Sequence, residues 1–540
     1  MLPPLVLRPP HGPRLVRLLV VILAAMFHVA TAGWSLVANG AEGELAATAR
    51  ELLSSGGGFA SNPTTLVAGP LALWLVRMSL ALFGVNDFAV RLPTALGAVA
   101  MIWFTLRLAE RYGTVWSGFV AALLLLCSPG MFTLGRTLTP APLTAAFVAA
   151  CLYCLQCACE RRPRRRRWML LAWVAWGFAT LAGGWMAAAV PAGTVLLLAV
   201  FYGEARLRFR ALLSLEGVFV LVLTMATMTA AGFPLFGGAA ASPELTKPVW
   251  QFVCWQAGLL FPWSLLLLPA AGALLLRLAP RQPPLEWSEA FPLAWLTAGL
   301  ALALADPART LFSSLLFWPA FAVWGAARLE TLHRRTFLRW SGVTVIVACG
   351  GLFLTGRLGQ FLPLLFPAKA QAFQAIPSYF WPAVTPVAII AMLAFVLFVA
   401  ASFWTELLQN RRFALLALFA AMIPAGFAFA DIGAKFALYF SDGNLARCID
   451  ANREMHPVVF VDASRFDASS LRYYLGEDYR KRIHHAAQPS ELQLRWKHPA
   501  YLVTTRERGP CWKQILGDRV TLACESGEHL LLATRPENGP

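Results

Sequence analysis

Apolar stretches of about 20 residues recur along most of this chain, separated by short polar segments. Hydrophobic residues make up 58% of the 540 residues and charged residues only 14%, whereas soluble domains carry about 25% charged residues. A backbone in lipid must satisfy its own hydrogen bonds, which favours helices. The sequence therefore predicts an all-α polytopic membrane protein with thirteen spans, near 15–38, 89–108, 114–130, 138–158, 168–187, 188–204, 213–234, 253–276, 288–305, 310–327, 339–356, 381–404 and 413–432.

The net charge of +17 comes from arginine clusters that lie between these apolar stretches. The largest has six arginines between Arg161 and Arg167. Such clusters mark cytoplasmic loops, because positive charge resists translocation. We therefore expect a cytoplasmic N-terminus, an outer C-terminus and no nucleic-acid partner. Binding of anionic membrane lipids by the same clusters is a secondary expectation.

One apolar segment, Leu66–Val85, is nearly long enough to cross the membrane. A crossing there would move the six-arginine cluster to the outside, against its strong orientation signal. Its Gly69-Pro70 start, Trp74 and Arg77 instead suit a helix in the membrane interface. The sequence thus predicts an outer loop over 39–88 that contains interfacial helices.

The composition changes near residue 433, where charges of both signs become frequent and long apolar runs stop. We expect a membrane domain over 1–432 and a small outer α/β domain over 433–540. Predicted strands lie at Val458–Val461, Tyr501–Val503, Ile515–Val520 and His529–Thr534. In an oxidising compartment two of its three cysteines would pair; Cys511 with Cys524 is the first expectation, leaving Cys448.

Four further cysteines follow a C-x-x-C-x-x-C pattern inside one predicted span, at Cys151, Cys154, Cys157 and Cys159. Buried free cysteines commonly serve as small packing residues, so packing is favoured over an iron–sulfur or zinc site. The sequence predicts no cofactor, with a divalent metal as the open alternative.

Several short strings carry a resemblance to a known family. The first outer loop reads Ala41-Glu42-Gly43-Glu44 and closes with Arg91-Leu92-Pro93. Gly135-Arg136, Pro262-Trp263-Ser264 and Trp318-Pro319-Ala320 follow. Together they resemble the GT-C membrane glycosyltransferases that use a polyprenyl-phosphate sugar, the group of lipid A aminoarabinose transferases and protein O-mannosyltransferases. The resemblance covers essentially the whole chain and implies a bacterial inner-membrane location.

The same comparison identifies departures at motif positions. Ala41 stands where the family carries the Asp expected to act as acid or base, and Ala68 stands where a Lys is usual. Pro140 and Gly183 replace an acid and a Lys in later loops. Each replacement is small or apolar, which is what a site freed from catalysis would accept.

The polar residues that remain give the candidate site. Glu42 and Glu44 are candidate catalytic residues, with Glu42 as a general base in place of the lost Asp; the alternative is solvated charge on an interfacial helix. If this segment is helical, Glu44 and Glu51 share a face. Candidate phosphate-binding cations are Arg136, Lys247, Arg309 and Arg357, with interaction with lipid headgroups as the alternative. Asp431 and Lys435, four apart, favour a local ion pair.

The resemblance implies a transferase that moves a sugar from an undecaprenyl-phosphate carrier to lipid A, another lipid or a protein. The missing Asp keeps a second hypothesis open, a catalytically inactive family member that binds a polyprenyl lipid or partners an active transferase. A transporter is disfavoured, because neither paired repeats nor interrupted helices at corresponding positions are visible in the sequence.

Overall fold

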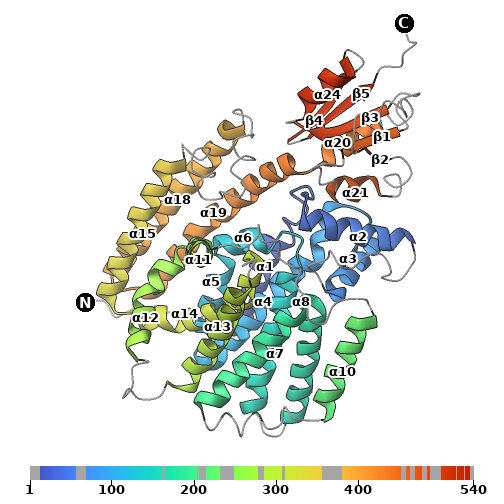
Figure 1. Ribbon diagram of the computed structural model, residues 1–540. Helices are drawn as coiled ribbons and strands as arrows, with labels where there is room; N and C mark the ends of the chain where they lie inside the picture. Colours follow the sequence, from blue (N-terminus) through green and yellow to red (C-terminus); the bar gives the residue numbers. More distant parts are fainter. Residues whose placement is uncertain are drawn as a thin grey trace.

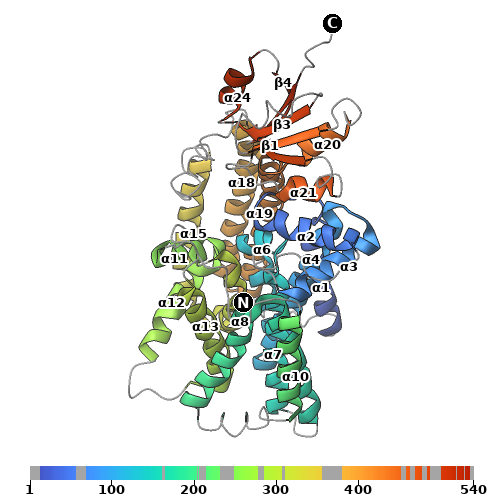
Figure 2. The ribbon, with the colours of Figure 1, turned by 45° about the vertical axis from the view of Figure 1, so that its right-hand side comes forward.

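The computed structural model places a helical bundle below a small α/β domain (Figures 1 and 2). It describes the chain except for 1–12, 56–68, 161–163, 203–204, 206–208, 210–214, 231–247, 278–284, 307–309, 356–379, 452–457, 463–468, 477–482, 487–499, 507, 518–519, 528 and 535–540. The predicted fold class, an all-α membrane bundle with a small C-terminal α/β domain, is confirmed.

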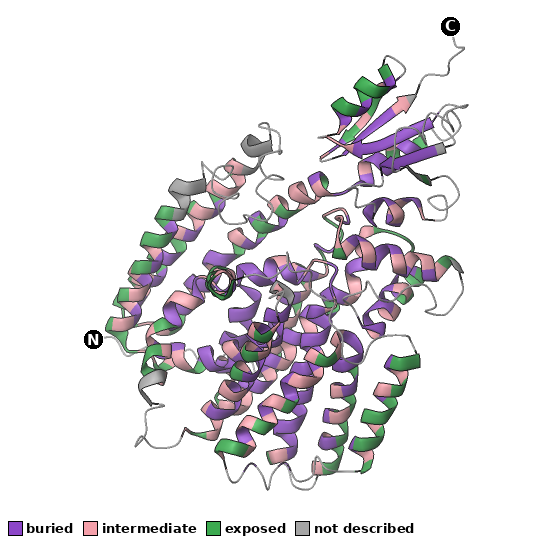
Figure 3. Ribbon diagram, viewed as in Figure 1, coloured by how far each residue is buried: buried purple, intermediate pink, exposed green. Residues whose placement is uncertain are grey.

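Within the described ranges, six helices are long and apolar enough to cross a membrane, or seven if one bent pair counts as a span. They are α4 (Asp87–Tyr112), α7 (Ala141–Glu160), α8 (Arg165–Phe201), α13 (Trp287–Ala305), α18 (Phe380–Leu407) and α19 (Arg411–Phe440). Helix α7 is the most buried of these, whereas α18 lies at the edge of the bundle and has the smallest buried share, 22% of its apolar window (Figure 3). Five of these helices each match one predicted span, and α8 covers the two spans predicted over 168–187 and 188–204.

The remaining helices of the bundle are shorter or less apolar. They are α1 (Pro13–His28), α2 (Ala41–Ser55), α3 (Pro70–Phe83), α5 (Val115–Leu126), α6 (Pro129–Leu134), α10 (Leu215–Ala230), α11 (Val249–Leu259), α12 (Trp263–Arg277), η5 (Leu311–Leu316), α14 (Trp318–Thr331) and α15 (Arg334–Thr355). Helix α3 has 14 residues, a length of about 21 Å that falls short of the roughly 30 Å core. The expectation that this segment does not cross the membrane agrees with that length.

Helix α8 is in fact two helices joined at Gly184, whose φ of 68° lies outside the helical region. Trp176 Nε1 donates to the carbonyl oxygen of Ala188 over 3.0 Å. Twelve residues of straight helix would separate these groups by about 18 Å, so the chain doubles back. Two helical segments that double back on each other therefore lie where spans are predicted over 168–187 and 188–204, with the turn at Gly184.

The span predicted over 253–276 is not one continuous helix. Helices α11 and α12 meet there at a bend of 115°. Pro262 lies at the break, where it removes a backbone donor and its ring would clash with the preceding turn of a continuous helix. Proline also accompanies breaks in two other predicted spans. Helix α6 begins at Pro129, near the end of the span predicted over 114–130, and the span predicted over 310–327 is divided between η5 and α14, which begins at Trp318-Pro319.

The C-terminal domain is built on a five-stranded sheet of order β2-β1-β3-β5-β4. Its strands are β1 (Val458–Asp462), β2 (Ile483–Ala486), β3 (Ala500–Thr505), β4 (Val520–Ser526) and β5 (His529–Thr534). Strands β2, β1 and β3 are parallel, and β5 and β4 join antiparallel. Alternate residues form two cores: Val459 and Val461 pack with α20 (Gly443–Ala451) and α21 (Ser469–Leu475), whereas Phe460 packs with α24 (Gly509–Leu516).

Two sequence predictions for this domain are wrong. Residues 515–516 end helix α24 rather than begin a strand, and β4 starts only at Val520. The disulfide joins Cys448 to Cys524, not Cys511 to Cys524. Cys511 lies exposed on α24, whereas Cys448 lies on α20, which packs against β4 and so brings it to Cys524.

Candidate functional site

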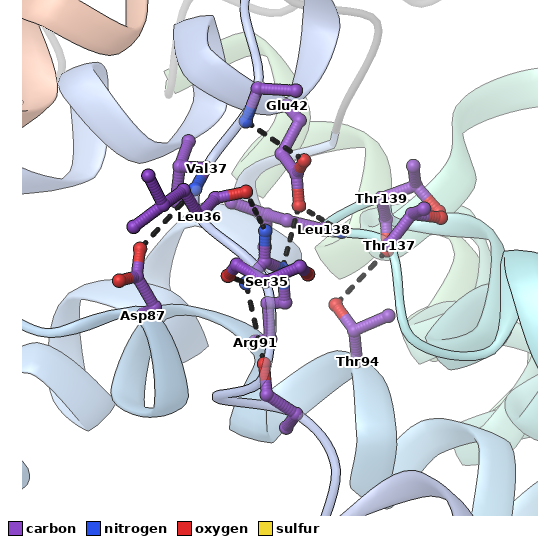
Figure 4. Close-up of polar contacts among 12 residues, drawn as sticks. Ser35, Leu36, Val37, Glu42, Asp87, Arg91, Thr94, Thr137, Leu138 and Thr139 are labelled. Carbon is purple, nitrogen blue, oxygen red and sulfur yellow. Dashed lines mark hydrogen bonds and ion pairs between the residues drawn. The ribbon is translucent and has the colours of Figure 1, made fainter. Parts of the chain in front are cut away.

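The first outer loop forms helix α2, which begins at Ala41 and places Glu42 in its first turn. Figure 4 shows the Glu42 carboxylate turned toward helix α4 and the loop before α7. Its Oε1 accepts from Arg91 Nε over 2.7 Å and from the backbone N–H of Leu138 over 3.0 Å. Its Oε2 accepts from the backbone N–H of Ala38 over 3.2 Å. Three chain segments thus meet on one carboxylate.

The partner of Glu42, Arg91, has a side chain that is only 2% exposed. Its remaining nitrogens donate to backbone carbonyls of the turn before α2, at Ala32, Ser35 and Leu36 (Figure 4). A buried guanidinium needs such a paired and hydrogen-bonded setting. The geometry therefore makes Glu42 the counter-ion of a buried cation, with both of its oxygens occupied.

Glu44 contacts the C-terminal domain. Both of its oxygens lie 3.2 Å from Nη1 of Arg472 on α21, and Nη2 of Arg472 lies 3.0 Å from Glu51. The expectation that Glu44 and Glu51 share a helix face is confirmed. Two half-exposed carboxylates thus share one arginine that comes from more than 400 residues away in the chain.

A second contact joins the two domains at the same place. Tyr474 Oη donates to Asp87 over 2.6 Å and accepts from the backbone N–H of Val37 over 2.8 Å. Arg50 donates to the backbone carbonyls of Tyr473 and Tyr474. Burial and the nearby Asp87 carboxylate raise the pKa of Tyr474 above its usual range. Helix α2 is consequently held between the bundle and α21.

Arg136 lies just after α6, at the same end of the bundle as α2. Its Nε donates to the carbonyl of Phe132 over 2.9 Å, and Nη1 donates to Oγ1 of Thr31 over 3.2 Å. Burial, followed by the charge of Arg91, lowers the pKa of Arg136 to about 10. No carboxylate pairs with it in the part of the chain that the structure describes. Of the four predicted phosphate-binding cations it is the one described; Lys247, Arg309 and Arg357 lie outside the described residues.

An apolar groove of about 370 Å³ lies between α3, α4 and α7. Its one hydroxyl, Ser79, donates to the carbonyl of Ala89. The groove therefore presents hydrocarbon and aromatic surface, from Leu75, Met78, Leu82, Phe83, Leu92, Pro93, Leu96, Gly97, Ala100, Phe104, Leu143, Ala146 and Phe147. Met78, Leu82, Phe83 and Leu96 at its rim are more than half exposed, as suits a groove that opens toward lipid.

The sequence reasoning missed Arg91, Arg472 and Tyr474 as site-forming residues. Arg91 belongs to the Arg91-Leu92-Pro93 string that carries the family resemblance, but this string does not by itself indicate a buried ion pair. Other predictions of the site agree with the structure: Asp431 pairs with Lys435 over 2.6 Å. Cys151, Cys154 and Cys157 lie buried in the main core, and the partly buried Cys159 packs against it, as the packing interpretation predicts.

Comparisons with known proteins agree with this fold. Residues 67–229 match the family model described as dolichyl-phosphate-mannose-protein mannosyltransferase. Comparison with curated sequences finds no match. Among solved structures, ArnT from Cupriavidus metallidurans bound to undecaprenyl phosphate superposes with a TM-score of 0.76 at 19% identity, over 97% of this chain and 99% of that one. The apo form of that ArnT gives the same TM-score and identity, over 97% and 98%. The chain therefore has the GT-C membrane glycosyltransferase fold of ArnT, and its residues 67–229 carry the mannosyltransferase family pattern.

Proposed function

We propose that this protein works on a polyprenyl-phosphate-linked sugar at the outer face of a bacterial inner membrane. As a glycosyltransferase it would deliver the sugar to lipid A, another lipid or a protein. The proposal rests on two features of the described chain: an apolar groove whose rim side chains are exposed, and Arg136, which lacks a carboxylate partner among the described residues. A long isoprenoid chain suits the groove, and arginine suits a phosphate group.

The similarity to ArnT supports the class of carrier. That structure was solved with undecaprenyl phosphate, and the likeness extends over nearly the whole of both chains. We extend the carrier class to this chain as part of the proposal. Lys247, Arg309 and Arg357 are proposed as further phosphate contacts, since sequence reasoning assigns them to the outer face.

The orientation is proposed from two features. Arg165–Arg167 begin helix α8, whose start lies at the end of the bundle opposite the C-terminal domain (Figure 1), as suits a cytoplasmic arginine cluster. The Cys448–Cys524 disulfide lies in the C-terminal domain, and disulfides persist in oxidising compartments such as the periplasm. We therefore infer a cytoplasmic N-terminus and a periplasmic C-terminal domain.

A second candidate function is favoured by the contacts of the acidic residues in the first outer loop. Ala41 has no ionisable group, Glu42 is bound by three donors and Glu44 is paired with Arg472. A general base must reach the proton it abstracts, and neither glutamate has an unoccupied carboxylate. This favours a member of the fold that binds a polyprenyl-phosphate lipid, or partners an active transferase, without catalysing transfer.

One experiment separates the two. The full chain in lipid nanodiscs is offered radiolabelled undecaprenyl-phosphate sugars together with a membrane extract as acceptor. Transfer by the wild type that Glu44→Gln abolishes, while the matched Glu51→Gln variant keeps it, would establish an enzyme that uses Glu44. Absence of transfer with saturable binding of undecaprenyl phosphate supports the binding function. Absence of both refutes the proposal.

A further inference from the structure

A buried histidine without hydrogen-bond partners lies beside Arg136. His28 ends helix α1 and is fully buried, and neither of its ring nitrogens has a hydrogen-bond partner in the described structure. Leaving a buried polar group unsatisfied costs about 1–3 kcal/mol. Unsatisfied groups of this kind are few in native proteins and point to a ligand, an ion or water that satisfies them.

The imidazole fits closely against the turn that precedes Arg136. A β-carbon at residue 135 would lie 2.7 Å from Cε1 and 2.8 Å from Nδ1 of His28, too close for any side chain. Gly135 has an ordinary right-handed helical backbone, with φ of −72° and ψ of −8°, so its conformation does not require glycine. Glycine is required here because the His28 ring and the carbonyl oxygen of Met131, 2.7 Å from the same position, leave no space for a β-carbon.

The same short segment after α1 also fixes the arginine. Nη1 of Arg136 donates to Oγ1 of Thr31, three residues beyond His28. Nη2 of Arg136 has no hydrogen bond among the described residues and lies 4.0 Å from the position that a β-carbon at Gly433 would take. A cation with an unused donor and a buried imidazole with two unused nitrogens therefore share one small region.

We propose that His28 and Arg136 together bind the phosphate group of the polyprenyl carrier. This inference rests on the proposed function and adds a phosphate contact from α1. Arg136 supplies charge and an N–H donor, while a neutral imidazole donates one N–H to a phosphate oxygen. An anion suits the pair better than a cation does, because Arg136 has no carboxylate partner among the described residues, whereas the nearby charge of Arg91 is neutralised by Glu42. His28 is thus a phosphate-binding residue.

The test measures binding of radiolabelled undecaprenyl phosphate to the full chain in nanodiscs. His28→Phe fills the same space without a hydrogen bond, and His28→Asn restores a donor. The matched control is His333→Phe, at an exposed histidine between α14 and α15. Loss of one hydrogen bond to a charged group predicts about tenfold weaker binding for His28→Phe, a smaller loss for His28→Asn and no change for His333→Phe.

The outcomes are distinguishable. Wild-type binding that His28→Phe leaves within twofold, in a variant that unfolds at the wild-type temperature, overturns the inference and leaves the proposed function intact. No binding by the wild type overturns both. If His28→Phe does not fold, Gly135→Ala, which must displace the His28 ring or the turn that carries Arg136, is expected to weaken binding, and unchanged affinity overturns the inference. Phosphatidic acid and inorganic phosphate serve as competitors. If His28→Phe weakens the binding of inorganic phosphate but not that of the polyprenyl lipid, the inference is also overturned.

Discussion

Replacing Glu42 by alanine tests whether this residue is a structural counter-ion. The change removes the acceptor of Arg91 Nε and of the backbone N–H groups of Leu138 and Ala38. Because the Arg91 side chain is only 2% exposed, water cannot easily replace the carboxylate. Removing one partner of a buried ion pair costs about 3–5 kcal/mol, and Arg91 keeps its bonds to backbone carbonyls. We therefore expect a destabilisation near the lower end of that range.

The assay is thermal unfolding of the detergent-solubilised protein, compared with Glu51→Ala on the same helix. Glu51 is paired with Arg472 nearer the surface, so its loss is expected to cost at most about 1 kcal/mol. The Glu42→Ala protein should unfold at a clearly lower temperature than both the wild type and Glu51→Ala. A Glu42→Ala variant as stable as the wild type would refute the structural role, and loss of transfer in that same variant would restore Glu42 as a catalytic candidate.

Three further predictions concern the C-terminal domain. Because the disulfide joins Cys448 to Cys524, the wild type should migrate differently on reducing and non-reducing gels. This difference should be lost in Cys448→Ser and in Cys524→Ser, and it should be retained in Cys511→Ser. Arg472→Ala should expose helix α2 to protease, since it removes the cation that two carboxylates share; a wild-type digestion pattern would contradict this. Tyr474→Phe should cost about 1–3 kcal/mol. Because the folded-state pKa of Tyr474 is raised, its stabilisation should be present below about pH 10 and be lost as pH rises further, whereas Tyr474→Phe should lack this loss.

The hydropathy of the sequence predicted the positions of the long helices in the bundle well, but it predicted the bends between helices poorly. Apolar length located α4, α7, α13, α18 and α19 to within a few residues at most of their ends, because length and hydropathy alone decide such spans. Breaks depend on single prolines, and Pro386 and Pro424 lie inside helices α18 and α19 without ending them. Neighbouring helices can satisfy the freed backbone groups, so a proline in sequence does not by itself predict the bend at Pro262.

The candidate site was less predictable, because its geometry depends on contacts between distant segments. The spacing of Glu44 and Glu51 correctly predicted a shared face, yet the arginine that joins them comes from α21. The burial of Arg91 against Glu42 likewise follows from how α4 packs beneath the outer loop. A motif string indicates that such residues belong together, but only the tertiary structure distinguishes a carboxylate that neutralises a buried cation from one that meets a substrate.

The central claim is that this protein binds a polyprenyl-phosphate lipid in the groove between α3, α4 and α7. Its most direct test is binding of undecaprenyl phosphate to the full chain in nanodiscs, with Ala100→Phe filling the groove and Ala401→Phe on the exposed face of α18 as control. The account predicts saturable binding by the wild type and Ala401→Phe, and strongly weakened binding by Ala100→Phe. Absence of wild-type binding, or equal binding by the two variants, would contradict it.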